Sequence, residues 1–365
     1  MDSRQLKTSI FLLVAAGGIL LAILVDVLVF ERQITSAGWS GPGDFHIFQS
    51  GAHAIFEHSN AVGELQYPPP FLLLISPFAV LPSNFGDVLW VLAGILVLAF
   101  VGARLGLGCW QVMVGLLSPP VLYCATMGET GLFISSALLL ALACADTAPV
   151  LAGIAAGCVV IKPQFSILLP FCFLAGHQWR AFAAAAVTVL VLCLLPALLF
   201  GSWVWNLFLN EELKVAWADV SAPGAFQEHM MVTPFVFFRT LGISDHWSGL
   251  IQVMISLAAI AACWRLWSLR RENKITAEYR LAATACLIFL ATPFAYIYDL
   301  SVVAFSLLLY AARRRPAWAA AIAVFWGFTG AYGLISTFAW PAGALLIFAT
   351  MLTILPGAQA GLCAD

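Results

Sequence analysis

The chain has 365 residues, of which 62% are hydrophobic and only 9% are charged. Soluble domains carry about one charged residue in four, so this composition predicts a membrane protein with several spans. The formal net charge of -2 and the lack of a basic stretch with interleaved aromatic residues argue against nucleic acid as a partner.

The first apolar run covers residues 9–30 and is interrupted only by Asp26. It exceeds the roughly 20 residues that cross a hydrocarbon core. No cleavage site of small residues follows a short apolar region, so we expect a retained span and not a removed signal peptide. Further apolar runs continue along the chain. We therefore expect one all-α, polytopic membrane domain over residues 1–365, with roughly 10–12 transmembrane helices.

Lysine and arginine occur in a few short segments between the apolar runs, and such segments face the cytoplasm. Arg4 and Lys7 precede the first run, Arg180 begins another, and two basic groups lie within residues 265–280 and 313–315. Placing them all inside leaves two long segments outside, at about 31–69 and 201–245. Because these segments hold most of the histidines and many acids, we expect the chemistry on the outer or periplasmic side of the plasma (inner) membrane.

Apolar residues recur at three- and four-residue spacing over residues 44–58 of the first outer segment, with Phe45 and Phe48 on the same side. The pattern predicts a short amphipathic helix whose aromatic face lies in the headgroup boundary. Asp44 follows the turn at residues 41–43 and takes the position of an N-cap, so capping is one interpretation of this acid. The other interpretation is a functional carboxylate just outside the membrane.

The run Tyr67-Pro68-Pro69-Pro70 introduces the next apolar segment, residues 71–81. Each proline disfavours helix in the residue before it, so we expect an extended entry that would form a rigid wall beside a lipid. Plain punctuation at the start of a helix is equally compatible with the run.

Lys162 lies between two apolar runs, residues 150–161 and 165–175, and is followed by Pro163. An ionisable residue at membrane depth is costly, which makes it a functional hypothesis. We predict that Lys162 binds a phosphate; alternatively, it satisfies carbonyls that the proline frees. Arg239 in the second outer segment is a weaker candidate of the same kind, and snorkelling to the interface would also explain it.

Several short motifs occur in order along the chain. They are Asp44-Phe45 with Phe48, Tyr67-Pro68-Pro69, Gly128-Glu129-Thr130-Gly131, Ile161-Lys162-Pro163-Gln164 and, at residues 292–300, Thr-Pro-Phe-Ala-Tyr-Ile-Tyr-Asp-Leu. Together they resemble glycosyltransferase family 87, the polyprenol-phosphate-mannose-dependent mannosyltransferases of the GT-C superfamily. The chain departs from that pattern at Glu129, where the family usually has glutamine. It also departs at Tyr298-Asp299, where many relatives have a tryptophan and histidine pair.

The resemblance implies a GT-C-like fold and an inverting transfer of mannose, or another hexose or pentose, from a polyprenyl phosphate to a lipid or glycan acceptor. The acid of the first outer loop, here Asp44, would be the general base. Lys162 and Arg239 would bind the donor phosphate. Neither a cofactor nor a metal ion is expected. Residues expected to orient the substrates are His46, Tyr67, Glu129, Gln164, Tyr298 and Asp299.

Two other classes of protein stay open at this point. A transporter or flippase of lipid-linked glycans would also need buried charges, but near the middle of the membrane. A scaffold of a cell-envelope complex would need none of the outward acids. The expected position of Asp44 and Asp299 at one interface favours the enzyme, whereas the sugar and the acceptor are not specified by the sequence.

Overall fold

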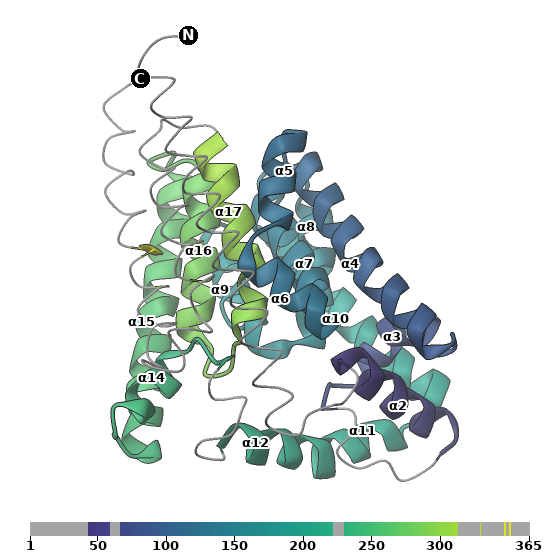
Figure 1. The fold of residues 1–365 in the computed structure, drawn as a ribbon. Helices are drawn as coiled ribbons and strands as arrows, with labels where there is room; N and C mark the ends of the chain where they lie inside the picture. Colours follow the sequence, from purple (N-terminus) through teal and green to yellow (C-terminus); the bar gives the residue numbers. More distant parts are fainter. Residues whose placement is uncertain are drawn as a thin grey trace.

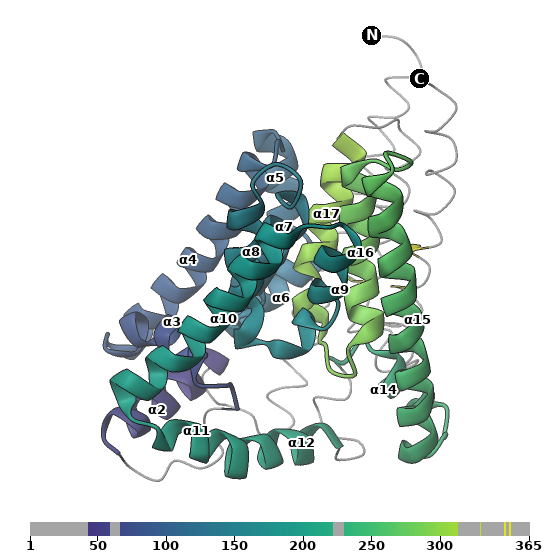
Figure 2. The ribbon, with the colours of Figure 1, turned by 180° about the vertical axis from the view of Figure 1, so that it is seen from behind.

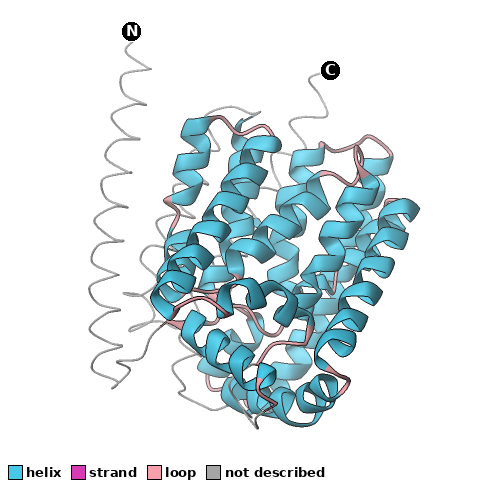
Figure 3. Ribbon diagram, turned by 90° about the vertical axis from the view of Figure 1, so that its right-hand side faces the viewer, coloured by secondary structure: helices cyan, strands magenta, loops and turns pink. Residues whose placement is uncertain are grey.

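The computed structural model describes residues 43–58, 66–221 and 230–312, with single residues at 329, 347, 350 and 351. Across these ranges the chain consists of helices and connecting loops (Figure 3). An isolated antiparallel bridge between Met231 and Tyr296 is the only strand-like pairing of the described residues. The predicted all-α fold is thereby confirmed. The expected first span, residues 9–30, and the apolar runs after residue 313 lie outside the described residues.

The first half of the described chain contains a series of mostly short helices. They are α2 (Asp44–Phe56), α3 (Pro70–Ala79), α4 (Ser83–Arg104), α5 (Cys109–Leu116), α6 (Pro119–Met127), α7 (Gly131–Ala143), α8 (Pro149–Cys158), the 3-10 turns η1 (Val159–Ile161) and η2 (Pro163–Ser166), and α9 (Leu169–Ala175).

The second half includes two longer helices and a π-helical turn. Its elements are α10 (Trp179–Phe200), α11 (Trp203–Leu207), the π turn η3 (Phe208–Glu212), α12 (Leu213–Ser221), α14 (Pro234–Thr240), α15 (Asp245–Arg271), α16 (Ala277–Ala291), the 3-10 turn η4 (Ile297–Leu300) and α17 (Ser301–Ala312).

Three described helices are long and apolar enough to cross a membrane, namely α4, α10 and α15. The pair α5 and α6 adds a fourth candidate if it counts as one span, and it bends by 59°. Pro119 and Pro120 explain the bend, because proline starts a helix readily but cannot continue one. Five shorter apolar segments are also present. The roughly 10–12 spans expected for the whole chain remain a prediction.

Helices α4 and α10 carry large apolar side chains on the outside of the bundle. Leu96 and Phe100 of α4 are each 66% exposed, and Leu198 of α10 is 78% exposed. A contiguous apolar surface of this kind is unfavourable in water. Lipid chains would cover it, so these two helices face the hydrocarbon of the bilayer.

The bundle has two different ends (Figure 1). Helices α2, α11 and α12 lie across the lower end in this view, where α15 also begins, whereas α5 and the last turns of α15 lie at the upper end. From behind, α10 runs diagonally across the bundle and leads into α11 at the lower end (Figure 2). The lower end therefore gathers the described parts of the two predicted outer segments.

The predicted short helix is present as α2, but its aromatic face is buried in protein. Phe45 and Phe48 are 0% and 5% exposed. The Phe48 ring lies 5.0 Å from that of Phe71 in α3, and the Phe45 ring lies 6.2 Å from that of Trp90 in α4. The prediction that this face lies in the headgroup boundary is wrong, because α3 and α4 cover it.

The polar side of α2 ties the helix to its neighbours. The side-chain amide of Gln49 donates to the carbonyls of Ala79 at 2.9 Å and Leu81 at 2.8 Å. It accepts from the Ser83 hydroxyl at 2.6 Å. These carbonyls lie at the end of α3 and just beyond it, where a helix leaves acceptors without intrahelical partners. Gln49 therefore fixes α2 against the junction of α3 and α4.

Candidate active site

Asp44 lies in the first turn of α2, one residue beyond the position predicted for it. Gly43 is the N-cap, and no side chain caps this helix. The interpretation of Asp44 as a capping residue is therefore wrong. Its carboxyl group instead makes a hydrogen bond with the side chain of Glu129, between α6 and α7.

Gly128 brings these two acids together. It ends α6 with a φ of +70°, a left-handed conformation that favours glycine. A Cβ at this position would lie 3.2 Å from the backbone nitrogen of Phe45, the residue after Asp44. The Trp90 indole donates to the Gly128 carbonyl at 2.8 Å and holds the turn in place. The absent side chain thus lets α2 lie against the end of α6, so that Asp44 meets Glu129.

Lys162 lies at the break between η1 and η2, which Pro163 causes as predicted. Its Nζ lies 2.9 Å from Oδ1 of Asp299 and 3.7 Å from Oε2 of Glu129. The three residues are only 5%, 3% and 8% exposed, in that order. Lys162 is therefore the partner of two buried acids, which replaces its interpretation as a partner of freed carbonyls.

Two tyrosines flank the ammonium group of Lys162. Its Nζ lies 5.0 Å from the ring centroid of Tyr298 and 5.7 Å from that of Tyr67, within the range of cation–π attraction. The Tyr67 hydroxyl donates to Oε2 of Glu129 at 3.1 Å and lies 3.0 Å from the Thr130 hydroxyl. Tyr67 thus connects the lysine to the loop after α6.

The proline run after Tyr67 starts a helix. Pro69 has helical angles, with φ -50° and ψ -30°, and α3 begins at Pro70. The predicted extended entry is therefore wrong at Pro69, and punctuation at a helix start is the correct interpretation. Proline is well suited to the first turn because its missing N–H has no intrahelical partner there.

Asp299 lies in η4, directly before α17, and it is buried. Its Oδ2 accepts from the backbone nitrogen of Tyr296 at 3.2 Å. Asp299 is therefore not part of a solvated rim. Tyr296 stacks on Tyr298, with ring centroids 5.2 Å apart and planes at 15°. The bridge between Met231 and Tyr296 places the residues just before α14 next to Tyr296.

The charges of this cluster do not balance. Lys162 is the cation between Glu129 and Asp299, and Asp44 adds a third carboxyl group. Asp44 is half-exposed as a residue, but its carboxyl group faces the protein. Burial, and then the neighbouring Glu129, raise the pKa of Asp44 from 3.8 to about 9. Near neutral pH Asp44 therefore carries a proton.

The pKa of Glu129 shifts in the opposite direction. Burial disfavours its ionised form, but Lys162 and the hydrogen bonds from Asp44 and Tyr298 outweigh burial and lower the pKa of Glu129. The Thr130 backbone nitrogen also donates to Oε2 of Glu129, at 3.1 Å. Sequence reasoning did not single out Thr130, although it belongs to a motif that we noted. Its position directly after Glu129 was the available signal.

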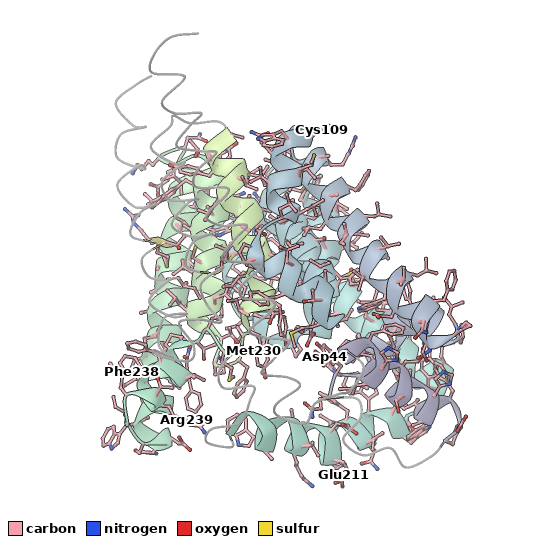
Figure 4. All side chains as sticks on the ribbon, viewed as in Figure 1. Asp44, Cys109, Glu211, Met230, Phe238 and Arg239 are labelled. Atoms are coloured by element: carbon pink, nitrogen blue, oxygen red, sulfur yellow. The ribbon has the colours of Figure 1, made fainter. Side chains whose placement is uncertain are left out.

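The structure brings six of the nine predicted site residues into one cluster and places a seventh elsewhere. Arg239 lies in α14, where its Nε is 3.4 Å from Oδ1 of Asp245. Figure 4 shows it well apart from Asp44 at the same end of the bundle. His46 and Gln164 are half-buried and lie two residues from Asp44 and Lys162 in the sequence. The clustered residues are Asp44, Tyr67, Glu129, Lys162, Tyr298 and Asp299.

Within the described ranges, no group of three or more histidine, cysteine or acidic side chains is arranged to hold a metal ion. What the cluster offers chemically is a carboxyl group of raised pKa beside an anchored carboxylate and an ammonium group. Such a set can accept a proton and stabilise an anion.

The model of glycosyltransferase family 87 matches residues 65–293, more than half of the chain. The match includes Tyr67, Glu129 and Lys162. Asp44 and Asp299 lie outside it, so their place in the site rests on the geometry alone. No curated protein and no solved structure matches the chain.

Proposed function

Because the chain belongs to glycosyltransferase family 87, we propose that it moves a sugar from a polyprenyl phosphate to a lipid or glycan acceptor at the outer face of the plasma membrane. Family membership makes it a membrane glycosyltransferase, which sets aside the transporter and scaffold alternatives. The observation that supports the proposal most directly is the cluster of Asp44, Glu129, Lys162 and Asp299 at one end of the bundle.

In the proposed reaction, an acceptor hydroxyl attacks the anomeric carbon of the donor. A new carbon–oxygen bond forms to the acceptor, and the bond to the donor phosphate breaks, with its electrons leaving on the phosphate. A single displacement of this kind inverts the configuration. Asp44 first loses its own proton to water and then takes the hydroxyl proton as general base. The leaving group is already activated, so one base and one cation are sufficient.

Lys162 is the proposed ligand of the donor phosphate. An ammonium group has three N–H donors. The 2.9 Å contact with Asp299 takes one of them, whereas Glu129 at 3.7 Å is beyond normal hydrogen-bond distance. The group therefore retains capacity for a phosphate oxygen. Arg239, outside the cluster, keeps its predicted role as a second cation. His46, Tyr67, Gln164, Tyr298 and Asp299 are assigned to orienting the substrates.

The distribution of basic residues supports an outward-facing site. The upper end of α15 and the turn after it carry Arg270, Arg271 and Lys274, and such clusters mark the cytoplasmic side. The lower end, with Asp44, then faces outside. An impermeant thiol reagent applied to intact cells should label Glu57→Cys and leave Lys274→Cys unlabelled, in a background with Cys109 replaced. Labelling of Lys274→Cys alone would reverse the orientation.

The function is tested with the full chain purified into nanodiscs. A panel of radiolabelled polyprenyl-phosphate sugars, including mannose, other hexoses and pentoses, is offered with a membrane lipid extract as acceptor. We expect one sugar to be transferred by the native protein and not by Asp44→Asn. Transfer from a nucleotide sugar, or from no member of the panel, would overturn the proposed donor class.

A further inference from the structure

We infer that Asp44 and Glu129 form a carboxyl pair that holds one shared proton, and that Glu129 thereby increases the basicity of Asp44. Glu129 is then a positioning residue for the base, and not only a group that orients substrates. The catalytic consequence rests on the proposed function, whereas the shared proton does not.

The hydrogen bond between the two side chains requires the proton. Ionised carboxylates are acceptors only, so a direct hydrogen bond between Asp44 and Glu129 needs one of them to be protonated. The structure distinguishes the two. The Tyr67 hydroxyl and the Thr130 amide both donate to Oε2 of Glu129 at 3.1 Å, and Lys162 lies 3.7 Å from the same atom. These donors stabilise the charge on Glu129, so the proton belongs to Asp44.

The supply of positive charge leads to the same assignment. Lys162 is held by Asp299 at 2.9 Å and is next to Glu129. One ammonium group compensates at most one of these acids fully, and a third ionised carboxyl group nearby would be strongly unfavourable in a buried site. Burial and Glu129 accordingly raise the pKa of Asp44 to about 9.

Other titratable groups face the pair from each neighbouring element. Tyr67 precedes α3 and Tyr298 belongs to η4. In α6, the Cys124 thiol donates to the Glu129 carbonyl at 3.4 Å. From α4, Asp87 reaches to within 3.5 Å of where a Cβ on Gly128 would lie. His46 lies on α2 itself. Among the described residues, Lys162 is the cation that contacts this group.

The pair explains how an aspartate can be a strong base at a membrane surface. When the shared proton leaves, burial and then repulsion by Glu129 give Asp44 a much higher proton affinity than an ordinary aspartate has. The rate of transfer should therefore rise with pH up to about 9. Glu129→Gln keeps the shape and removes the charge. It should move the acid limb of the pH–rate profile down by about one to three pH units.

Infrared titration of the full chain in nanodiscs, without donor or acceptor, tests the shared proton directly. We expect the carbonyl stretch of a protonated carboxyl group to persist at neutral pH and to disappear on titration to alkaline pH. The band should be missing from Asp44→Asn and should titrate at lower pH in Glu129→Gln. Glu211→Gln changes an exposed glutamate on η3 and is the matched control, with a native titration.

The outcomes separate this inference from the proposed function. A wild-type spectrum without a carboxyl band at neutral pH, or a band that survives in Asp44→Asn, overturns the pair even if sugar transfer is observed. This result needs only the wild type and Asp44→Asn, so it stands if Glu129→Gln fails to fold. A band that behaves as expected supports the pair even if no sugar in the panel is transferred.

Discussion

The two ends of the bundle use the same kinds of side chain with opposite charge balance. At the end away from the site, Asp146 accepts from Nη1 of Arg280 at 2.9 Å and from Nε of Arg270 at 3.1 Å. The guanidinium carbon of Arg280 also lies 4.0 Å from the ring centroid of Trp267. There, two cations share one acid. At the site, one cation lies among three acids.

This difference separates an ion cluster with a structural role from the proposed catalytic cluster. Burial opposes ionisation of Asp146, but Arg280 and Arg270 overcome it and lower the pKa of this acid. Asp146 therefore keeps its charge and holds α7, α15 and α16 together. The surplus of acids at the site raises the pKa of Asp44 instead. Burial opposes ionisation in both places. Asp146 is an exposed residue, whereas Asp44 is half-buried, so the depth of burial and the ratio of cations to acids together decide which carboxyl group can exchange a proton.

Removing the carboxylate of Asp44 should have the largest effect on the rate of sugar transfer. Asp44→Asn keeps the size of the side chain but cannot accept the proton, so we expect the initial rate of sugar transfer to fall roughly 10²- to 10⁴-fold. The measurement is the rate per folded molecule in nanodiscs. Glu57→Gln, exposed just after α2, is the control and should keep the native rate. An asparagine variant that transfers sugar as fast as the native protein would eliminate Asp44 as the base.

The same variant should also alter the pH dependence of stability. Folded Asp44 keeps its proton up to about pH 9, whereas the unfolded chain loses it near 3.8. The free energy of unfolding of the native protein therefore decreases as pH rises between these values. Asp44→Asn lacks this loss, so its thermal midpoint should exceed the native one by a margin that grows with pH. Parallel curves for the two proteins would contradict the raised pKa.

Breaking the ion cluster around Asp146 should lower the free energy of unfolding and leave the rate of sugar transfer unchanged. Asp146→Ala leaves Arg280, which is 1% exposed, without its carboxylate, and we expect a loss of about 3 kcal/mol in the free energy of unfolding. Denaturant unfolding in micelles measures it. Glu272→Gln breaks an exposed pair with Lys274 and should leave the free energy of unfolding nearly unchanged. A slower rate per folded molecule of Asp146→Ala, without loss of stability, would refute the structural role.

Lys162→Met tests whether the cation of the site also serves the donor. Methionine removes the charge with a modest change in volume, and loss of one charge-assisted hydrogen bond should weaken the binding of a labelled polyprenyl phosphate about 10- to 100-fold. Arg239→Met is the comparison and should have a smaller effect, since Arg239 is paired with Asp245 outside the cluster. Unchanged affinity in the folded Lys162→Met protein would leave Lys162 the structural role of compensating two acids.

Features that depend on residues close together along the chain were predictable from the sequence. Hydropathy indicated membrane helices, apolar spacing indicated the helix now seen as α2, and Pro163 indicated the break beside Lys162. The errors arose where a local pattern has to be placed in space. Periodicity shows which side of α2 is apolar, but only the positions of α3 and α4 show that protein covers that side. The N-cap was missed by one residue because it depends on the dihedral angles of Gly43.

The sequence by itself determined the class of protein, the family resemblance and most residues of the candidate site, because composition and short motifs are read along the chain. Only the tertiary structure decided how those residues meet. Lys162 and Asp299 are 137 positions apart, and Gly128 is what lets Asp44 reach Glu129. A pKa depends on burial and on distances between charges, and both are products of folding. The proton that distinguishes Asp44 from Asp146 is therefore a property of the fold.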